Sequence, residues 1–348
     1  MNLLVLNYSM NSQSQLFSHQ RRIVEQLSEF FDHVDVITAE DFQDLPLRRV
    51  NIRSTNWITG RNISNVLNFY RVAIPLLWKH RGGTVFSHMT QIQTLLALPI
   101  SRLFRLRHFL WFAHRSPSIS LKISYPFLDA VITSTPGSCP ISGKKVMPIG
   151  QAVDSRISNN SFDLQSIPPQ SFYHIGRMDP SKNIESIVHA LLPFRKSNNA
   201  ISLTLYGAPS SENTANYFER LKRQYSSSEY SNWVSFKGAI DNINIARISS
   251  QHDAFIHAFW GSLDKTLIEA TLLKRIVLSS NPEYLKEFYG KVITKEQASE
   301  ELVIQLTDIF TSSNQKIIED INRKFDLAIA NHSLDKWITR LSDILRGK

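Results

Sequence analysis

The sequence lacks the features of a disulfide-stabilised or membrane-spanning protein. It has a single cysteine, Cys139, which can form neither an intramolecular disulfide nor a cysteine-based metal site and suits a reducing compartment. Its longest apolar stretches, near 72–78, 95–100 and 109–113, are far shorter than a bilayer span. The N-terminal stretch MNLLVLNYSMNSQSQ has no basic region and only a short apolar run, so we expect no signal peptide. We therefore expect a cytoplasmic protein.

Two nucleotide-related motifs are also missing. No G-x-G-x-x-G follows the first predicted strand, which disfavours a dinucleotide-dependent dehydrogenase. No Asp-x-Asp pair stands at a strand end, the arrangement that would chelate Mg²⁺ or Mn²⁺ together with a diphosphate. We therefore expect no metal site and no bound cofactor.

Acidic residues are scarce in the first half of the chain. Residues 1–150 contain 16 Lys and Arg against 8 Asp and Glu, a net charge of +8, whereas the rest carries +1. Basic residues cluster at Arg48, Arg49 and Arg53, and again at Arg102, Arg105 and Arg107. A one-sided basic surface favours an anionic partner, although ordinary solubilising charge is an alternative. We expect an anionic membrane surface, which would hold the protein on the inner face of the plasma membrane, and no nucleic acid.

The fold class is predicted to be α/β. With 348 residues and 42% hydrophobic content, the chain has room for two cores. Short apolar runs alternate with amphipathic stretches, as in parallel sheets with crossover helices. The first-half strands are predicted at Leu3–Asn7, Val34–Thr38, Thr84–Ser87, Phe109–Ala113, Ala130–Thr133 and Val146–Ile149, with a helix over Gln15–Phe31. Those of the second half are predicted at Phe172–Ile175, Leu203–Tyr206, Val234–Phe236, Ala254–Ile256 and Ile276–Leu278.

A polar segment with Pro168 and Pro169 separates the two halves. The sequence thus predicts a Rossmann-like domain over 1–155, a linker over 156–170, and a second Rossmann-like domain over 171–348 that includes the terminal helices. Because open α/β sheets bind ligands at the carboxyl ends of their strands, two such domains facing each other would form a central cleft for donor and acceptor.

One candidate anion site is the segment FYHIGRMDPSKN. A predicted strand leads into Gly176 and Arg177, and Lys182 follows a turn just before a helix. A diphosphate at this strand end would meet a guanidinium fork, an ammonium and free helix N–H groups. The alternative is a turn with two solvated cations.

A second candidate site is the segment HAFWGSLDKTLIEATLL. The predicted strand ends near Gly261, Ser262 is a good N-cap, and Asp264 suits the positive end of the helix dipole. Lys265 and Thr266 lie in the first turn, and Glu269 follows Lys265 by one turn. A carboxylate there could accept hydrogen bonds from ribose hydroxyls. The alternative is an ordinary cap with a surface ion pair.

Taken together, these segments resemble family 4 of the retaining glycosyltransferases, which have the GT-B fold. The resemblance is strongest over 172–282, where GRMDPSKN, LTLYGAPSSENTANYFERLK, VSFKGAI and GSLDKTLIEA follow one another in the family's order. In the first half LWFAHRS is similar to the segment that carries the family's active-site histidine, and VMPIGQAVD to the junction between the domains.

The resemblance implies transfer of a hexose from a nucleoside diphosphate sugar to a glycan or lipid-linked acceptor, as in bacterial polysaccharide biosynthesis, with no metal. It places Gly176, Arg177, Lys182 and Gly207 at the donor diphosphate, with Gly261, Ser262, Lys265, Thr266 and Glu269 on the helix that carries the ribose-binding glutamate. His114 would touch the donor sugar from the first half; its alternative is a structural histidine at a strand end. His88, which also ends a predicted strand, and His19, which lies within the first predicted helix, are weaker candidates.

The sequence departs from the family at two places. The family has two glutamates with seven residues between them, and Gly261 stands at the earlier position, so Asp264 or the backbone alone would contact the donor sugar. The first loop, YSMNSQSQ, lacks a glycine pair. Two other classes stay open: a sugar-nucleotide epimerase, which needs two acid–base groups in the cleft, and a non-catalytic protein that binds anionic surfaces. Turnover of a nucleotide sugar separates them.

Overall fold

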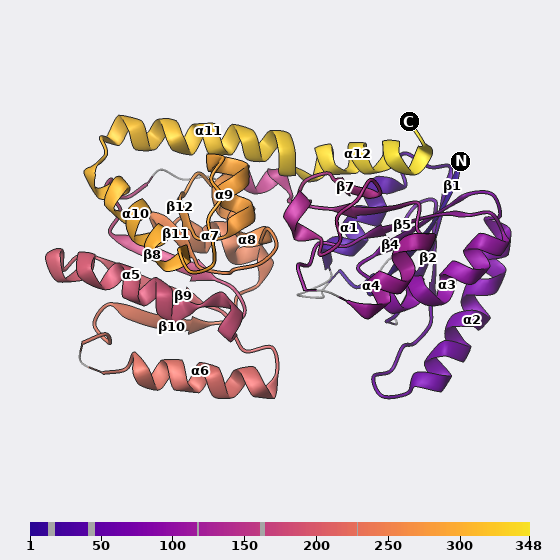
Figure 1. Cartoon of the computed structure of the whole chain (residues 1–348), viewed down its shortest axis with the longest axis horizontal. Coiled ribbons are helices and arrows are strands. Elements are labelled where there is room, and N and C mark those ends of the chain that lie inside the picture. The colour runs from indigo at the N-terminus through magenta and orange to yellow at the C-terminus, as the bar shows by residue number, and fades with distance from the viewer. Residues whose placement is uncertain (13–17, 41–45, 117, 161–163, 228) are drawn as a thin grey trace. The chain divides into compact units, whose positions relative to one another are not determined.

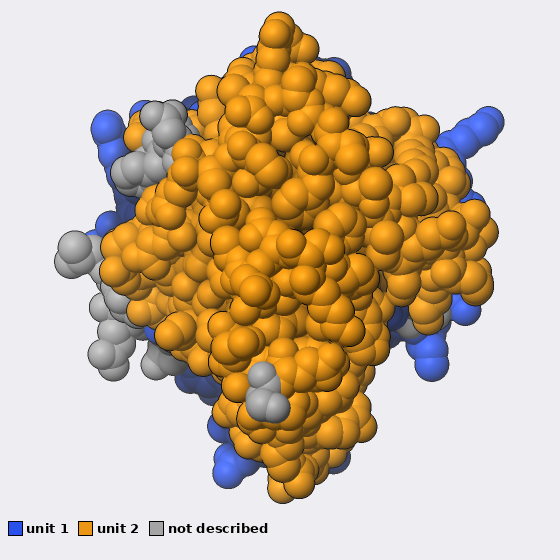
Figure 2. Space-filling view, turned by 90° about the vertical axis from the view of Figure 1, so that its left-hand side faces the viewer, with its two compact units in different colours: residues 1–150, 335–348 blue, residues 151–334 orange. Residues whose placement is uncertain are grey.

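The computed structural model describes residues 1–12, 18–40, 46–116, 118–160, 164–227 and 229–348. It divides into two compact units, and the division is not a simple cut of the chain. Unit 1 contains Met1–Gly150 and Asp335–Lys348, and unit 2 contains Gln151–Leu334 (Figures 1 and 2).

Unit 1 is built on one parallel sheet, in the order β3-β2-β1-β4-β5-β6-β7. Its strands are β1 (Asn2–Asn7), β2 (His33–Thr38), β3 (Val50–Ser54), β4 (Thr84–His88), β5 (Arg107–Trp111), β6 (Ala130–Thr133) and β7 (Val146–Pro148). Its α-helices are α1 (Ser18–Leu27), α2 (Asn62–Lys79), α3 (Gln91–Leu103), α4 (Ile119–Ser124) and most of α12 (Leu334–Arg346), and short 3₁₀ turns lie at Tyr125–Phe127 and Pro136–Ser138.

The sheet of unit 1 has helices on both faces. Because side chains alternate along a strand, Leu110 of β5 points to one face, where a cluster with Leu98 and Leu121 joins α3 and α4 to the sheet. Trp111 points to the other face, where its ring lies 5.0 Å from the buried ring of Trp337 on α12. The inner strands of the sheet, such as β5, are therefore buried from both sides.

Unit 2 repeats this architecture with the strand order β10-β9-β8-β11-β12. Its strands are β8 (Ser171–Ile175), β9 (Ser202–Tyr206), β10 (Val234–Gly238), β11 (Ala254–His257) and β12 (Ile276–Ser279). Its α-helices are α5 (Ile184–Ser197), α6 (Glu212–Gln224), α7 (Ile245–Ser249), α8 (Lys265–Leu272), α9 (Pro282–Tyr289), α10 (Ala298–Thr311) and α11 (Asn314–His332), and 3₁₀ turns lie at Ser155–Asn160, Pro180–Lys182 and Asn242–Asn244.

The predicted α/β fold class and the predicted strands are confirmed within a few residues at their ends, and one strand was missed. The edge strand β3, with the sequence VNIRS, is only partly buried and has no continuous apolar run. Predicted helix Gln15–Phe31 corresponds to α1, although its first residues, up to 17, lie outside the described residues. No helix in the described ranges is both long and apolar enough to cross a membrane.

The predicted domain limits differ from the structure at both ends of the second domain. Residues 335–348 pack with unit 1, because the apolar stripe of α12 buries Trp337 against the first sheet. Unit 2 already begins at Gln151, and the described part of the predicted linker forms hydrogen bonds with unit 2. The carboxylate of Asp253 accepts hydrogen bonds from the backbone N–H groups of Gln165, Ser166 and Gln170 at 2.9–3.1 Å.

Candidate functional site

Three neighbouring strands of unit 2 end close together, and their connecting loops carry most of the predicted site residues. β8 leads into Gly176, β9 into Gly207, and β11 into the loop that holds Gly261, and these strands are adjacent in the order β9-β8-β11. The loops meet tightly: Gly207 has φ of +149°, and a Cβ atom there would lie 1.8 Å from the carbonyl oxygen of Gly176. Gly207 therefore has a packing reason to be glycine, because the two loops touch through their backbones.

The two predicted phosphate-binding cations lie in the first loop but in different environments. The side chain of Arg177 is 57% exposed, and its Nε lies 3.6 Å from Asp179 Oδ2. Lys182 is only 8% exposed, because the 3₁₀ turn Pro180–Lys182, capped by Asp179, directs its side chain inward. Its ammonium lies 4.3 Å from the centre of the Phe259 ring.

Lys182 and Asp264 join the two predicted segments. The Lys182 ammonium donates a hydrogen bond to Asp264 Oδ2, and the His257 Nε2 lies 3.2 Å from the same oxygen. Burial would raise the pKa of Asp264, but Lys182 and the His257 hydrogen bond outweigh it and hold that pKa well below its usual range. The site therefore contains an ionised carboxylate paired with an ammonium, and a bound anion would share or displace that pairing.

Helix α8 begins later than the sequence indicates. Asp264, and not Ser262, is its N-cap: Asp264 Oδ1 accepts hydrogen bonds from the backbone N–H and the hydroxyl of Thr266, each at 3.3 Å. Ser262 instead lies in the bend before the helix, where its carbonyl oxygen accepts a hydrogen bond of 3.0 Å from Asn281 Nδ2. Both residue types cap helices well, so composition alone could not choose between them.

The departure at Gly261 has a local explanation. A Cβ atom at this position would lie 2.2 Å from the Phe259 ring, which occupies the space that a longer side chain would need. The same ring packs on the Lys182 ammonium. Beside Gly261 the chain therefore has a cation over an aromatic face.

The predicted ribose-binding residue, Glu269, is buried rather than exposed on the surface. Its side chain is 8% exposed, and its Oε1 lies 3.2 Å from the ammonium of Lys265 on the preceding turn. The predicted proximity of Lys265 and Glu269 is confirmed as an i,i+4 ion pair, in which the Lys265 side chain is 38% exposed. A carboxylate that is paired with one lysine keeps further lone pairs for hydroxyl donors.

Two buried histidines of this site were not predicted. His257 ends β11, and His174 precedes the last residue of β8, so both lie beneath the loops described above. Burial lowers the pKa of His174 to about 3, and that of His257 also falls, although Asp264 opposes the latter effect. His174 Nδ1 donates to the Ile256 carbonyl at 3.0 Å, and its Nε2 has no hydrogen-bond partner within the described chain. Polar residues at the ends of two buried strands, in YHIG and IHAF, were the available signal.

The remaining predicted catalytic residue lies in unit 1. His114 is exposed in the loop after β5, and its Nδ1 accepts a hydrogen bond of 3.1 Å from the Ser116 backbone N–H, which leaves its Nε2 as the donor. His88, at the end of β4, is buried against the rings of Trp111 and Trp337. Burial and the neighbouring His19 hold the pKa of His88 well below its usual range, so it is a neutral core residue.

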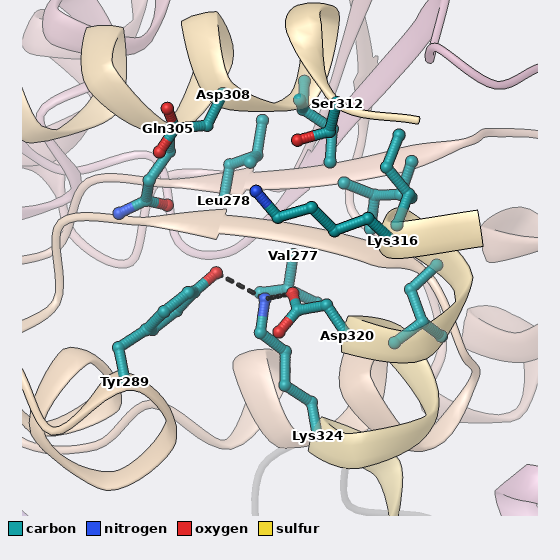
Figure 3. Close-up of a pocket in the computed structure, with 13 residues that line it drawn as sticks. Val277, Leu278, Tyr289, Gln305, Asp308, Ser312, Lys316, Asp320 and Lys324 are labelled. Carbon is teal, nitrogen blue, oxygen red and sulfur yellow. Dashed lines mark hydrogen bonds and ion pairs between the residues drawn. The ribbon is translucent and has the colours of Figure 1, made fainter. Parts of the chain in front are cut away.

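A separate cavity of about 200 Å³ lies at the free edge of the unit 2 sheet, between β12, α10 and α11 (Figure 3). It contains none of the predicted site residues. The buried Lys324 at its wall is already satisfied, since it donates to the Tyr289 hydroxyl and lies 2.5 Å from Asp320 Oδ2. In the described ranges, no group of three or more His, Cys, Asp or Glu residues is placed to hold a metal ion.

The sequence matches no model of a known protein family and no curated protein. Solved structures do match over the whole chain. A complex of Anabaena HepE with UDP has a TM-score of 0.75 at 14% identity, with 100% of both chains covered. A glycosyltransferase from Rickettsia africae has a TM-score of 0.70 at 13% identity, with 99% of this chain and 98% of that chain covered.

A third match is the E. coli trehalose-6-phosphate protein bound with UDP-2-fluoro glucose. Its TM-score is 0.74 at 11% identity, and the alignment covers 100% of this chain and 99% of that chain. At these identities the likeness concerns the fold. The chain has the GT-B fold, and its two parallel sheets with their helices are the two Rossmann-like domains of that fold.

Proposed function

We propose that the protein is a retaining glycosyltransferase of the family 4 type that moves a sugar from a nucleoside diphosphate sugar to a glycan or lipid-linked acceptor. The observation that carries this proposal is the cluster at the carboxyl ends of β8 and β11: a buried Lys182, an exposed Arg177 and a buried Glu269. Structures of Anabaena HepE with UDP and with UDP-glucose, which share the fold, support a nucleotide-sugar donor.

In the proposed mechanism the cations stabilise the leaving group. As the bond between the sugar and the diphosphate breaks, negative charge develops on the diphosphate oxygens, and Arg177, Lys182 and the first turn of α8 would stabilise it. Glu269 would accept hydrogen bonds from the ribose hydroxyls, and Asp264 would contact the donor sugar or orient Lys182. His114 would contact the donor sugar from unit 1. Because these cations neutralise the diphosphate, the reaction would need no metal.

The basic charge of unit 1 supports attachment to an anionic membrane at the inner face of the plasma membrane.

A ligand screen tests this function. Thermal unfolding would be followed with UDP, GDP, ADP and CMP sugars in excess EDTA, and a true donor at about 100 times its dissociation constant adds roughly 2.7 kcal/mol of stability. We expect one nucleotide class to stabilise the protein and to be hydrolysed or transferred in EDTA. If no nucleotide sugar binds, the proposal is wrong; if activity needs Mn²⁺, only its metal independence is wrong.

A further inference from the structure

The three helices on one face of the unit 1 sheet leave apolar side chains exposed in a regular pattern. On α2, Ile63, Leu67, Ile74 and Trp78 follow one another at spacings of four, seven and four residues, so they form one stripe along the helix. This stripe lies opposite the buried face of α2, which packs Phe69, Ala73 and Leu77 on the sheet.

The neighbouring helices continue the pattern. Ile92 and Leu103 of α3 lie on its outer side, as do Ile119 and Ile123 of α4, and each is at least half exposed. Ile63, Leu103 and Ile119 are between 74% and 80% exposed. Because α3 packs against both α2 and α4, these outward sides form one surface, which we call the α2–α4 face (Figure 1). Apolar side chains grouped in this way on a folded unit indicate a surface that something covers.

The charge around this face is mainly basic, although two of its cations pair with carboxylates: Arg102 lies 3.4 Å from Asp129 Oδ2, and Lys79 lies 2.7 Å from Asp35 Oδ2. Residues 45–128, which include all three helices, contain 12 Lys and Arg and no Asp or Glu. Arg71, Arg81, Arg105 and Lys122 are exposed on or beside the helices of the face. Arg107, which the sequence grouped with the basic cluster, does not contribute, because it holds the Leu345 carbonyl of α12 at 2.7 Å on the other side of the sheet.

A shallow notch joins the apolar and basic features where α2 and α3 end. The Trp78 ring packs edge-on against Phe104 with centroids 5.1 Å apart, and the Arg81 guanidinium lies 5.2 Å from its centre. Leu103 and Arg105 complete the rim of the notch. An exposed tryptophan beside two guanidiniums has the chemistry of the lipid interface, where indole rings lie at headgroup depth and cations meet phosphates.

We infer that the α2–α4 face is the membrane-docking surface of the protein, with an anionic lipid bilayer as its partner. The apolar stripes would enter the interfacial layer, and the notch at Trp78 would hold a lipid phosphate between Arg81 and Arg105. A soluble polyanion would use the charges but leave the stripes exposed, whereas a bilayer covers both. This inference deepens the proposed membrane attachment and rests on it, but it does not depend on sugar transfer.

Vesicle flotation tests the inference with two variants and a matched control. The apolar variant carries Ile63→Ser, Leu67→Ser and Leu103→Ser, the charge variant carries Arg81→Ser and Arg105→Ser, and the control carries Val292→Ser and Lys295→Ser in exposed positions of unit 2. Vesicles of phosphatidylglycerol with phosphatidylcholine are compared with phosphatidylcholine alone. We expect each α2–α4 variant to lower the partition coefficient on anionic vesicles about tenfold or more, and the control to leave it unchanged.

Each other outcome decides a different point. If the wild-type protein ignores anionic vesicles at low salt, both the attachment and this inference are wrong. If it binds them and the apolar variant binds equally well, the attachment stands and the α2–α4 face is wrong. If lipid-free light scattering shows a dimer that the apolar variant abolishes, the face belongs to a second copy instead. Nucleotide binding, measured in parallel, should be unchanged in every variant and tests the donor site separately.

Burial of Trp78 gives an independent readout. Brominated lipids quench tryptophans that enter the bilayer, and subtracting the emission of Trp78→Phe isolates this residue among the six tryptophans. Quenching and a blue shift of the Trp78 signal on anionic vesicles support the inference. Equal quenching in wild type and Trp78→Phe would overturn it.

Discussion

At the scale of single residues, the candidate donor site consists of paired charges rather than free ones. The Lys182 ammonium is neutralised by Asp264, and the Lys265 ammonium lies 3.2 Å from Glu269. Buried pairs of this kind hold side chains in one position, because removing a partner leaves a charge without compensation. Arg177 is mostly exposed and is the cation that an incoming diphosphate would meet with least rearrangement.

The role of Glu269 can be separated from its ion pair. If Glu269 binds the ribose, Glu269→Gln should raise the dissociation constant of the free nucleotide about tenfold, because a charge-assisted hydrogen bond becomes a neutral one. Isothermal titration calorimetry measures this. The matched control is Glu219→Gln on α6, which breaks an exposed pair with Lys222 at 3.0 Å and should not change binding. If Glu269→Gln binds the nucleotide with wild-type affinity, Glu269 does not bind the ribose and only pairs with Lys265.

At the scale of secondary structure elements, α2 is fixed to the sheet by a buried carboxylate. Asp35 of β2 is fully buried and accepts hydrogen bonds of 2.7 Å from Lys79 and His80, at the end of α2, and of 2.8 Å from Asn51 of β3. Burial would raise the pKa of Asp35, but these donors outweigh it and lower the pKa far below its usual value. The element that carries the longest apolar stripe of the α2–α4 face is thus rigidly placed.

This carboxylate gives a pH-dependent stability. Because the folded-state pKa is lowered, its contribution is complete above the ordinary aspartate range and is lost as pH falls below about 4. Asp35→Asn should lower the free energy of unfolding by about 3 kcal/mol at pH 7, and by less at pH 3. Urea unfolding at both pH values measures this. Asp343→Asn, which breaks a half-exposed pair with Arg346, should change it by less than about 1 kcal/mol. An equal loss at both pH values for Asp35→Asn would contradict this account.

Elements were predicted best where they are buried on both sides. β1 and β11 are almost continuous apolar runs, so their positions followed from the sequence. Edge strand β3 was missed because a partly exposed strand has no such run. The amphipathic pattern of α12 showed that one stripe is buried, but not against which sheet, since either domain offers an apolar face.

The candidate donor site was also predicted only in part. The sequence placed Arg177 after a strand, Lys182 just before a helix and Glu269 one turn past Lys265, which is where they lie. It could not reveal that Lys182 turns inward to Asp264, or that Phe259 fills the space beside Gly261, because both depend on contacts between segments about 80 residues apart or on loop geometry. His174 and His257 were not predicted as site residues, because a buried polar residue within an apolar strand leaves no periodic pattern in the sequence.

At the scale of the whole molecule, the two units carry complementary chemistry. Unit 2 contains the paired charges of the candidate donor site, and unit 1 contains an excess of basic residues and the exposed apolar stripes of the α2–α4 face. We infer a division of labour in which unit 2 binds the nucleotide sugar while unit 1 stays at the membrane where a lipid-linked acceptor resides. The chain leaves unit 1 after Gly150 and returns to it at Asp335, in α12.

The most direct test of the central claim is the affinity for UDP, or for the diphosphate that the screen selects, in Arg177→Ala and Lys182→Ala. Each change removes a charge-assisted contact of roughly 1.5–3 kcal/mol, so the dissociation constant should rise about 10- to 150-fold while circular dichroism stays that of the wild type. Lys182→Ala leaves Asp264 with fewer partners, so Arg177→Ala, at an exposed position, is the cleaner of the two. If both variants bind the nucleotide as tightly as the wild type, the phosphates do not bind at the ends of β8 and β11.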